Sequence, residues 1–425
     1  MSGFEIKDKD KLPSATKVTC PRCKAQLVVN TYAQCTHLAC GSCSSLYNAN
    51  EGNLVFVKTF KQKYKAHIPV GSVGKLKGIK YKVVGFIQYR EYKTPYNWGE
   101  YILFNPSVGY AFLSEYDGHW NLFEQSLIYP TQPLREFKFE NYNFRLFHHY
   151  KQNVDYAEGE FHWNINPSDK PKITEYISPP YILSKEENQN EHAWFLGEYI
   201  EPAKLTEAFG LNTKLPRKEG VGATQPLSLS FSVNAMYKMT GIAAALLILC
   251  QIIFQTVCRE EVILSKTYSV NESQSAFVTP SFEIKGGLMN QTNLLSEVSC
   301  DLHNDWLELN LTLINESTGE EIQFEQGIEY YYGYTGGENW SEGSRSSDQT
   351  LSEIPAGRYH MNILVHQQNS PTTKLFQYTL TADVSMWSNF FLSLLCLLIL
   401  PGLIIYRNHN FERNRWMNSN FSPYE

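Results

Sequence analysis

The sequence lacks the short motifs that identify the common enzyme classes. It contains no GxSxG nucleophile turn, no HExxH metal-binding helix, no phosphate-binding glycine loop and no dinucleotide fingerprint. It also lacks a long basic stripe with interleaved aromatic residues, which nucleic-acid binders usually carry. These absences give no support to the best-known hydrolases and nucleotide-binding enzymes, and they argue against nucleic-acid binding.

The beginning of the sequence lacks the apolar core of a secretory signal. Residues 1–13, MSGFEIKDKDKLP, are strongly charged instead. We therefore expect the N-terminal half to stay in the cytoplasm. Positive charge is scarce further along, because residues 259–384 contain 6 Lys and Arg against 18 Asp and Glu, whereas the rest of the chain is net positive. This division of charge suggests two parts that occupy different compartments.

Aromatic residues, by contrast, are abundant. They make up 14% of the chain, with 27 Tyr and 24 Phe, and such residues favour strands. The mean hydropathy is negative, which excludes a transporter built mostly of membrane helices. We expect a mainly β fold outside a small number of membrane spans.

Two long uncharged runs are the candidate spans. Residues 239–257 and 386–406 contain no charged side chain and are long enough to cross a bilayer as helices. A buried core helix is the alternative, but uncharged runs of this length usually span a membrane. Basic residues outside the two runs indicate that both termini are cytoplasmic. These residues are Arg217, Lys218, Lys238, Arg407, Arg413 and Arg415. Arg259 and Lys266, beyond the first run, oppose this orientation slightly.

Five of the nine cysteines lie within residues 20–43. Cys20 and Cys23 form one CxxC pair, and Cys40 and Cys43 form a second. Two CxxC turns at this separation typically direct four thiolates at one zinc ion, in a closed structural site with no open position for catalysis. Because so short a segment can hardly bury a core, metal binding would supply its folding energy.

Other interpretations of these cysteines remain open. Cys35 or His37, which lie between the two pairs, could replace one ligand. A thioredoxin-type redox pair needs a βαβ context, which the surrounding sequence does not show. Outside the ribbon, Cys300 has no evident partner except Cys258, so we do not expect disulfides to stabilise the later part of the chain.

Residues 66–215 alternate short strand-like runs with tight turns. The runs at 81–89, 98–104 and 109–113 have the composition of strands, and residues 117–120 form a turn. The pattern predicts an SH3-like or similar small β-barrel region, with two barrels in tandem as one arrangement.

Several runs in this region resemble the bacterial family called domain of unknown function 4178. The matching runs are GSVGKLKGIKYKVVGFIQY at 71–89, WGEYILFNPSVGYAFLSEYDGHW at 98–120, EGEFHW at 158–163, YISPP at 176–180 and WFLGEY at 194–199. Together they cover roughly residues 66–210, and an N-terminal ribbon fits the usual layout of the family. The family has no established activity, and the resemblance implies a bacterial envelope protein.

An enzyme in the same region is the main alternative. The candidate residues are Glu100, Glu115, Asp117, His119, Glu158 and Glu160. Paired carboxylates can act as acid and base when their environments separate their pKa values. A solvated strand face, a turn carboxylate and a packed turn histidine explain the same residues without catalysis. We therefore assign no catalytic residue.

Residues 259–385 again have the pattern of strands, and residues 306–314 alternate cleanly. Six to eight strands predict an exported β-sandwich. Glu338, Glu342 and Asp348 could offer oxygen ligands to a cation such as calcium, although the EF-hand spacing is absent. A long hairpin loop whose Trp340 packs on the sandwich is the preferred interpretation.

The predicted order of domains is zinc ribbon 17–60, cytoplasmic β-rich domain 61–213, linker 214–236, membrane helix 237–258, exported β-sandwich 259–385, membrane helix 386–406 and cytoplasmic tail 407–425. The leading hypothesis is a non-catalytic scaffold or sensor in the inner (plasma) membrane. It would contact the lipid bilayer, hold structural Zn²⁺ and bind protein partners on both sides. The alternatives are an enzyme of unknown class in the β-rich domain and a membrane-tethered nucleic-acid binder that uses the ribbon.

Overall fold

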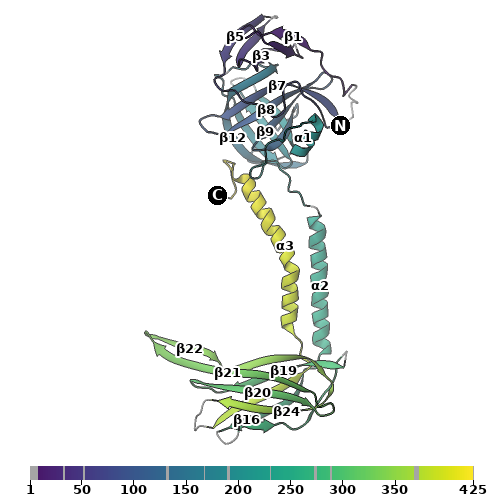
Figure 1. Cartoon of the computed structure of the whole chain (residues 1–425), viewed down its shortest axis with the longest axis vertical. Helices are drawn as coiled ribbons and strands as arrows, with labels where there is room; N and C mark the ends of the chain where they lie inside the picture. The colour runs from purple at the N-terminus through teal and green to yellow at the C-terminus, as the bar shows by residue number, and fades with distance from the viewer. Residues whose placement is uncertain are drawn as a thin grey trace. The chain divides into compact units, whose positions relative to one another are not determined.

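A computed structural model describes residues 8–31, 34–50, 53–130, 134–166, 168–188, 192–229, 231–271, 275–287, 290–367 and 373–424. The chain forms two compact units. One contains residues 1–230 and 403–425, and the other contains residues 231–402. Strands predominate in both units, as the sequence predicts (Figure 1).

The first unit is built on a closed barrel of eight antiparallel strands. The strands follow one another in the order β7–β8–β9–β10–β15–β14–β13–β12, and β12 pairs with β7 to close the ring. Their bounds are β7 Ile79–Glu91, β8 Asn97–Asn105, β9 Gly109–Tyr116, β10 His119–Gln125, β12 Tyr142–Phe161, β13 Lys172–Ser178, β14 Tyr181–Glu187 and β15 His192–Ile200.

Strand β12 explains why there is one barrel. Its first part, residues 145–151, pairs with β13, and its second part, residues 152–159, pairs with β7. A strand shared in this way gives the stagger that closes an eight-stranded sheet. The tandem arrangement of two small barrels is therefore wrong. Turn signals show where strands end, but they do not show which strands pair.

The N-terminal strands extend the barrel sheet. Strands β3 (His37–Cys40), β4 (Ser45–Asn50) and β5 (Asn53–Thr59) join it where β3 pairs with the end of β12. Strands β1 (Thr16–Thr19) and β2 (Gln26–Val29) form a separate hairpin. The remaining elements of this unit are β6 (Val73–Leu76), β11 (Glu136–Phe139) and α1 (Pro202–Phe209).

One buried carboxylate joins the N-terminal strands to the barrel. Glu160 of β12 is 1% exposed. The backbone N–H groups of Asn30 and Thr31 donate to it over 2.7 Å each, and the Thr31 hydroxyl donates over 2.6 Å. The Asn30 side-chain amide adds a donor at 2.8 Å. Buried charge of this kind is stable only when hydrogen bonds satisfy it, so Glu160 fixes the end of β2 against the barrel.

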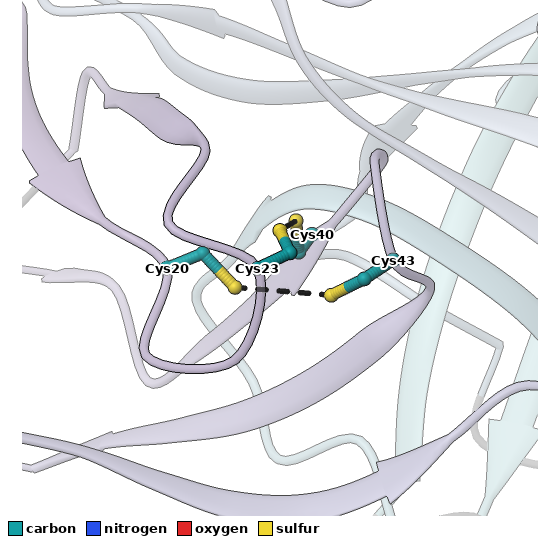
Figure 2. A group of neighbouring side chains, drawn as sticks. All are labelled: Cys20, Cys23, Cys40 and Cys43. Atoms are coloured by element: carbon teal, nitrogen blue, oxygen red, sulfur yellow. Dashed lines mark hydrogen bonds between the residues drawn. The ribbon is translucent and has the colours of Figure 1, made fainter.

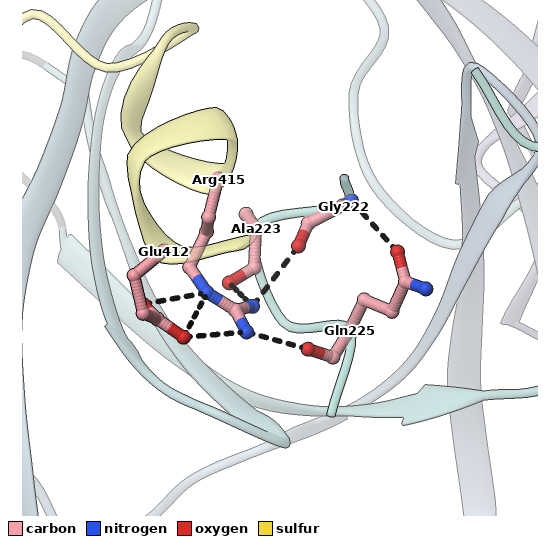
Figure 3. Close-up of polar contacts among 5 residues, drawn as sticks. All are labelled: Gly222, Ala223, Gln225, Glu412 and Arg415. Atoms are coloured by element: carbon pink, nitrogen blue, oxygen red, sulfur yellow. Dashed lines mark hydrogen bonds and ion pairs between the residues drawn. The ribbon is translucent and has the colours of Figure 1, made fainter. Parts of the chain in front are cut away.

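The C-terminus also belongs to the first unit. Arg415 is 1% exposed, and its guanidinium donates to the carbonyl oxygens of Gly222, Ala223 and Gln225 at 2.7 to 3.0 Å (Figure 3). The carboxylate of Glu412, one turn earlier, pairs with the same guanidinium. Next to it, Trp416 packs in a cluster with Phe147, Ile177 and Ile182 of the barrel. These contacts hold the end of the last helix on the barrel.

Two long helices flank the sandwich in the sequence. They are α2 (Val233–Val257) and α3 (Trp387–Trp416). Helix α2 begins at Ser232, whose hydroxyl accepts the Ala235 N–H at 3.3 Å. Helix α3 does not stop at residue 406, where the apolar run ends, but continues to Trp416. Much of the segment expected as a tail is thus helical.

The second unit contains a sandwich of two antiparallel sheets. One sheet has the order β16–β25–β19–β23, and the other has the order β17–β24–β20–β21–β22, with β18 paired to β24. The bounds are β16 Glu261–Val270, β17 Ala276–Val278, β18 Phe282–Ile284, β19 Gln291–Cys300, β20 Asp305–Asn315, β21 Glu321–Thr335, β22 Glu338–Ser344, β23 Ser346–Pro355, β24 Gly357–Gln367 and β25 Lys374–Ala382.

Alternation in these strands builds the core between the sheets. In β20, Leu307, Leu309 and Leu311 are buried, and the residues between them are less so. They pack against Phe376 and Tyr378 of the opposite sheet in one cluster. Two sheets around one core agree with the predicted sandwich, although they contain ten strands and not the six to eight expected.

Candidate metal centre

Two matching turns carry the four cysteines of the ribbon. Cys20 and Cys23 lie in the turn after β1, Cys40 is the last residue of β3, and Cys43 lies in the turn that follows it. The N–H of Lys24 donates to the Cys20 carbonyl at 3.0 Å, and the N–H of Ser44 donates to the Cys40 carbonyl at 2.8 Å.

Lys24 and Ser44 have the same backbone conformation, with φ of 64° and 56°. Each lies directly after the second cysteine of its pair, in the left-handed region that non-glycine residues rarely adopt. The two CxxC segments therefore form equivalent knuckles, each of which presents its two thiols on one side.

The four sulfur atoms converge on one point (Figure 2). All lie within 4.8 Å of one another. The Cys20 and Cys43 sulfurs are 3.8 Å apart, and the Cys23 and Cys40 sulfurs are 3.7 Å apart. A tetrahedral ion with metal–sulfur bonds of about 2.3 Å requires sulfur–sulfur edges of about 3.8 Å. The spacing is much longer than a disulfide and fits one metal ion with four thiolate ligands.

Burial makes a cation at this point favourable. Cys20 and Cys40 are fully buried, and burial raises the pKa of the Cys40 thiol to about 12. Ionised thiolates in such a place need a positive partner, and a divalent metal supplies it. The hydroxyl of Tyr47 lies 3.3 Å from the Cys20 sulfur and completes the wall of the site.

Cys35 and His37 lie outside the four-sulfur group. The Cys35 thiol donates to the His37 carbonyl at 3.2 Å, and burial raises its pKa to about 11. His37 Nδ1 lies 3.4 Å from the Thr36 hydroxyl. Cys35 belongs instead to an apolar cluster with Val29 and Leu38. The structure thus gives no support to either residue as a replacement ligand.

The candidate residues of the β9–β10 turn serve local structure. The Glu115 carboxylate accepts the Gly118 N–H at 2.8 Å. His119 is 5% exposed and lies 3.3 Å from the Tyr199 hydroxyl and 3.1 Å from the Glu219 carbonyl. Asp117 occupies the left-handed position of the turn, with φ of 49°. These contacts match the packed-turn interpretation.

The two carboxylates on either side of Gly159, Glu158 and Glu160, have different hydrogen-bond partners. Glu160 binds the N-terminal segment, whereas Glu158 accepts a hydrogen bond from the Tyr156 hydroxyl at 3.0 Å. Gly159 has φ of 91° and lies so close to Val84 that a Cβ there would meet its carbonyl at 2.3 Å. The backbone approach explains the glycine, and no shared acid–base geometry is present.

The acidic residues proposed for a calcium site do not gather. Glu338 and Glu342 are exposed on β22, and Asp348 lies on β23 in the other sheet. Among the described residues, the ribbon cysteines form the one group of three or more ligands close enough for a metal ion. Trp340 does not pack on the core either, because it is 44% exposed and lies over Gly333 in the β21–β22 hairpin.

Reasoning from the sequence missed several polar residues of the first unit. Glu175 and Glu186 were not singled out, although burial and then the charges of both, together with that of Glu100, raise the pKa of Tyr150. Strand alternation alone could have placed each on a face, but only the pairing of strands brings those faces together.

Comparisons with known proteins add little beyond one family. No curated protein sequence matches the chain. The structure of PNGF-II is 7% identical, with 71% of this chain and 68% of that chain covered and a TM-score of 0.22. The infectious bursal disease virus VP2 subviral particle is 9% identical, with 82% and 70% covered and a TM-score of 0.19. Similarities this weak carry no argument. Residues 69–202, in contrast, match the family described as Domain of unknown function (DUF4178), which agrees with the resemblance in the sequence.

Proposed function

We propose that this chain is a two-span membrane scaffold or sensor that joins a zinc-stabilised β-barrel module on one side of the bilayer to a β-sandwich on the other. The observation that carries the proposal is the exposure of the two apolar helices. The most apolar stretch of α2 has a mean hydropathy of 2.0, and none of its residues is buried. The most apolar stretch of α3 has a mean hydropathy of 2.3, and 11% of it is buried. Side chains so apolar and so exposed need lipid around them.

The orientation follows from charge. Basic residues flank the helices on the side of the barrel unit, and the sandwich between them is acidic. The positive-inside rule then leaves the barrel and both termini in the cytoplasm and the sandwich outside. A structural Zn²⁺ in the Cys20–Cys43 ribbon agrees with a reducing compartment, where four free thiols persist.

A docking surface supports the scaffold role. Strand β5 ends the order of the large sheet, so one of its sides has no neighbouring strand among the described residues. Val55, Phe56 and Val57 on it are 56%, 56% and 38% exposed. An apolar edge strand of this kind is a template for a strand of another protein. We propose that a cytoplasmic partner pairs with β5.

Labelling of single cysteines tests the topology. Ser341 on β22 and Lys65 before the barrel are both exposed. A membrane-impermeant maleimide should label Ser341→Cys in intact cells, but should label Lys65→Cys only after permeabilisation, in each case above the wild-type background. Equal labelling of both variants in intact cells, or release of the protein by alkaline carbonate, would contradict the proposal.

Cross-linking tests the docking surface. A partner cross-linked to the wild type in membranes should be lost with Phe56→Asp and kept with Tyr96→Asp, because Tyr96 is equally exposed but lies before β8. Loss of the partner with both variants, or with neither, would show that β5 is not the site.

A further inference from the structure

The inner face of the barrel carries acidic side chains among apolar and aromatic ones. Tyr176, Leu183 and Trp194 pack together on the outer wall beneath Phe139 of β11. Successive side chains of a strand point to opposite faces, so their neighbours Glu175, Ser184 and Phe195 point inward. The strand register supports a common face for these three residues, because Glu175 pairs with Ser184, and Ser184 pairs with Phe195.

The same reasoning places Glu100 inside. Its neighbour Tyr101 points outward, where its hydroxyl accepts the His67 N–H at 2.9 Å. In β14, Glu186 lies two residues after Ser184 and shares its face. Three carboxylates from three strands, Glu100, Glu175 and Glu186, therefore face the interior, and each is half-buried.

Two of these carboxylates have no partner. Glu175 accepts a hydrogen bond from the Tyr150 hydroxyl at 3.0 Å. Glu100 and Glu186 have no hydrogen bond or ion pair within the described residues. Lys185, which precedes Glu186 in β14, points outward, with its Nζ 5.7 Å from the Trp194 ring centre, and forms its ion pair with Glu187. A carboxylate that loses part of its hydration and has no partner is less stable in its charged form, so a positively charged ligand would be favourable at this place.

A second, independent feature points to a ligand. Tyr89 of β7 is only 7% exposed, and among the described residues its hydroxyl has no hydrogen-bond partner. Tyr89 pairs with Trp98, which lies two residues before Glu100 in β8 and shares its face, so Tyr89 is on the same inner face as Glu100. Burial, followed by the negative charges of Glu100 and Glu186, raises the pKa of Tyr89 well above its ordinary value. A buried phenol normally finds a partner, and here it is directed into the acidic interior.

Aromatic faces accompany the carboxylates. The ring of Trp98 stacks on Tyr89 with centres 5.6 Å apart, and Tyr150 meets Trp98 edge to face at 5.3 Å. His148 and Glu91 are titratable groups near Tyr150 and Glu175. The His148 Nε2 lies 3.6 Å from a Glu91 carboxylate oxygen, and the His148 Nδ1 is buried without a partner. The interior thus combines negative charge with electron-rich rings, and that combination attracts organic cations.

We propose that the barrel interior of this chain binds an organic ammonium ion between Glu100, Glu186 and the aromatic residues Tyr89, Trp98 and Tyr150. A single divalent metal fits less well. Among the described residues, only the ribbon cysteines have three or more ligand atoms within 4.8 Å of one another, and the oxygens of Glu100, Glu175 and Glu186 do not. The interior of an eight-stranded barrel is either filled by its own side chains or holds one small ligand. An ammonium group with an alkyl chain can pair with one carboxylate and lay its chain on the rings.

Calorimetry on the full chain in a non-ionic detergent tests this proposal, with n-butylammonium chloride as the probe at pH 8.5. The wild type should bind the probe saturably. Glu100→Gln and Glu186→Gln, which keep the shape and remove the charge, should each weaken binding at least tenfold. Glu124→Gln is the matched control, because Glu124 lies exposed on β10 and pairs with Leu196 of the outer wall. It should bind as the wild type does.

Any one of the following outcomes would overturn the proposal. The first is no saturable binding of n-butylammonium by the wild type. The second is equal binding of 1-butanol, which would identify an apolar pocket that does not need charge. The third is displacement of the probe by millimolar Mg²⁺, Ca²⁺ or Mn²⁺ with tighter binding, which would identify a metal site. Circular dichroism of the glutamine variants separates lost binding from lost folding. A folded Glu100→Gln protein with unchanged affinity would also contradict the assignment.

Discussion

At the scale of single residues, the buried Glu160 and the half-buried Glu100 differ in how their carboxylates are satisfied. The Glu160 carboxylate is satisfied by donors from Asn30 and Thr31, whereas Glu100 has no donor within the described residues. Hydrogen bonds to a carboxylate favour its charged form, and burial without them favours the neutral form. The same residue type thus acts as a structural anchor in one place and as a candidate binding group in another.

Replacement of Glu160 should loosen the ribbon. Glu160→Gln puts an NH₂ group where one oxygen accepts backbone N–H groups, and it should lower the free energy of unfolding by about 2–4 kcal/mol. Limited proteolysis should then cut near residues 30–36 earlier than in the wild type. Glu158→Gln is the control, because Glu158 accepts one bond from Tyr156 and should change proteolysis little. Equal effects of both variants would contradict the anchoring role.

The charge of Glu100 should make stability depend on pH. Burial, followed by the nearby charge of Glu186, raises the pKa of Glu100 from 4.5 to about 8. Between these values the folded state keeps a proton that the unfolded state has lost, so stability falls as pH rises from about 5 to 8 and then levels off. The slope cannot exceed about 1.4 kcal/mol per pH unit for one proton.

Thermal unfolding in detergent at pH 5, 6.5 and 8 tests this dependence. Glu100→Gln cannot ionise, so its melting temperature relative to the wild type should increase with each step in pH. Glu124→Gln should keep a constant difference from the wild type, because Glu124 is exposed. A constant difference for Glu100→Gln as well would show that its pKa is not raised by folding.

At the scale of elements, the ribbon shows how two turns create a site. The β1–β2 turn and the β3–β4 turn each supply two thiols, and the left-handed residues Lys24 and Ser44 give both turns the same shape. The CxxC spacing predicts this arrangement because it is local to each turn. Sheet pairing then brings β3 to the end of β12, which the spacing does not indicate.

Metal content should follow the four cysteines and not the fifth. The purified wild type should contain one zinc ion per chain by elemental analysis. Cys40→Ser should lose it, because three thiolates bind far more weakly than four, and protease should then degrade residues 16–59. Cys35→Ser is the control and should keep the metal, since its sulfur bonds to His37. Loss of zinc from Cys35→Ser alone would reverse the assignment.

At the scale of the whole molecule, contacts between distant parts of the sequence define the first unit. Residues 222–225 and 415 are far apart in the chain, yet Arg415 joins them, and Trp416 adds an apolar contact with the barrel. The sequence shows Arg415 only as one of several basic residues after an apolar run. Its burial could not be foreseen from a pattern that indicates membrane orientation.

Removal of this guanidinium should free the C-terminal segment. Arg415→Ala leaves three carbonyl oxygens without their donor, which should cost about 3 kcal/mol in local stability. Trypsin should then cleave after Arg413 faster, as measured by mass spectrometry of the released peptide. Arg413→Ala removes an exposed charge and tests whether charge alone matters. In Arg413→Ala, trypsin should cleave after Arg407 as slowly as in the wild type. Fast cleavage after Arg407 in this variant would contradict the claim that Arg415 holds the C-terminal segment.

The sequence by itself determined what depends on neighbours along the chain. Two uncharged runs predicted the two apolar helices, alternation predicted the strands of the sandwich, and two CxxC pairs predicted the four-thiol site. Tertiary structure alone decided what depends on which strands pair. It closed β12 on β7, gave Glu160 its donors, and put Glu100, Glu175 and Glu186 on the inner face of one barrel. The reason is physical, because a strand's period assigns a side chain to a face, and only long-range pairing decides what that face encloses.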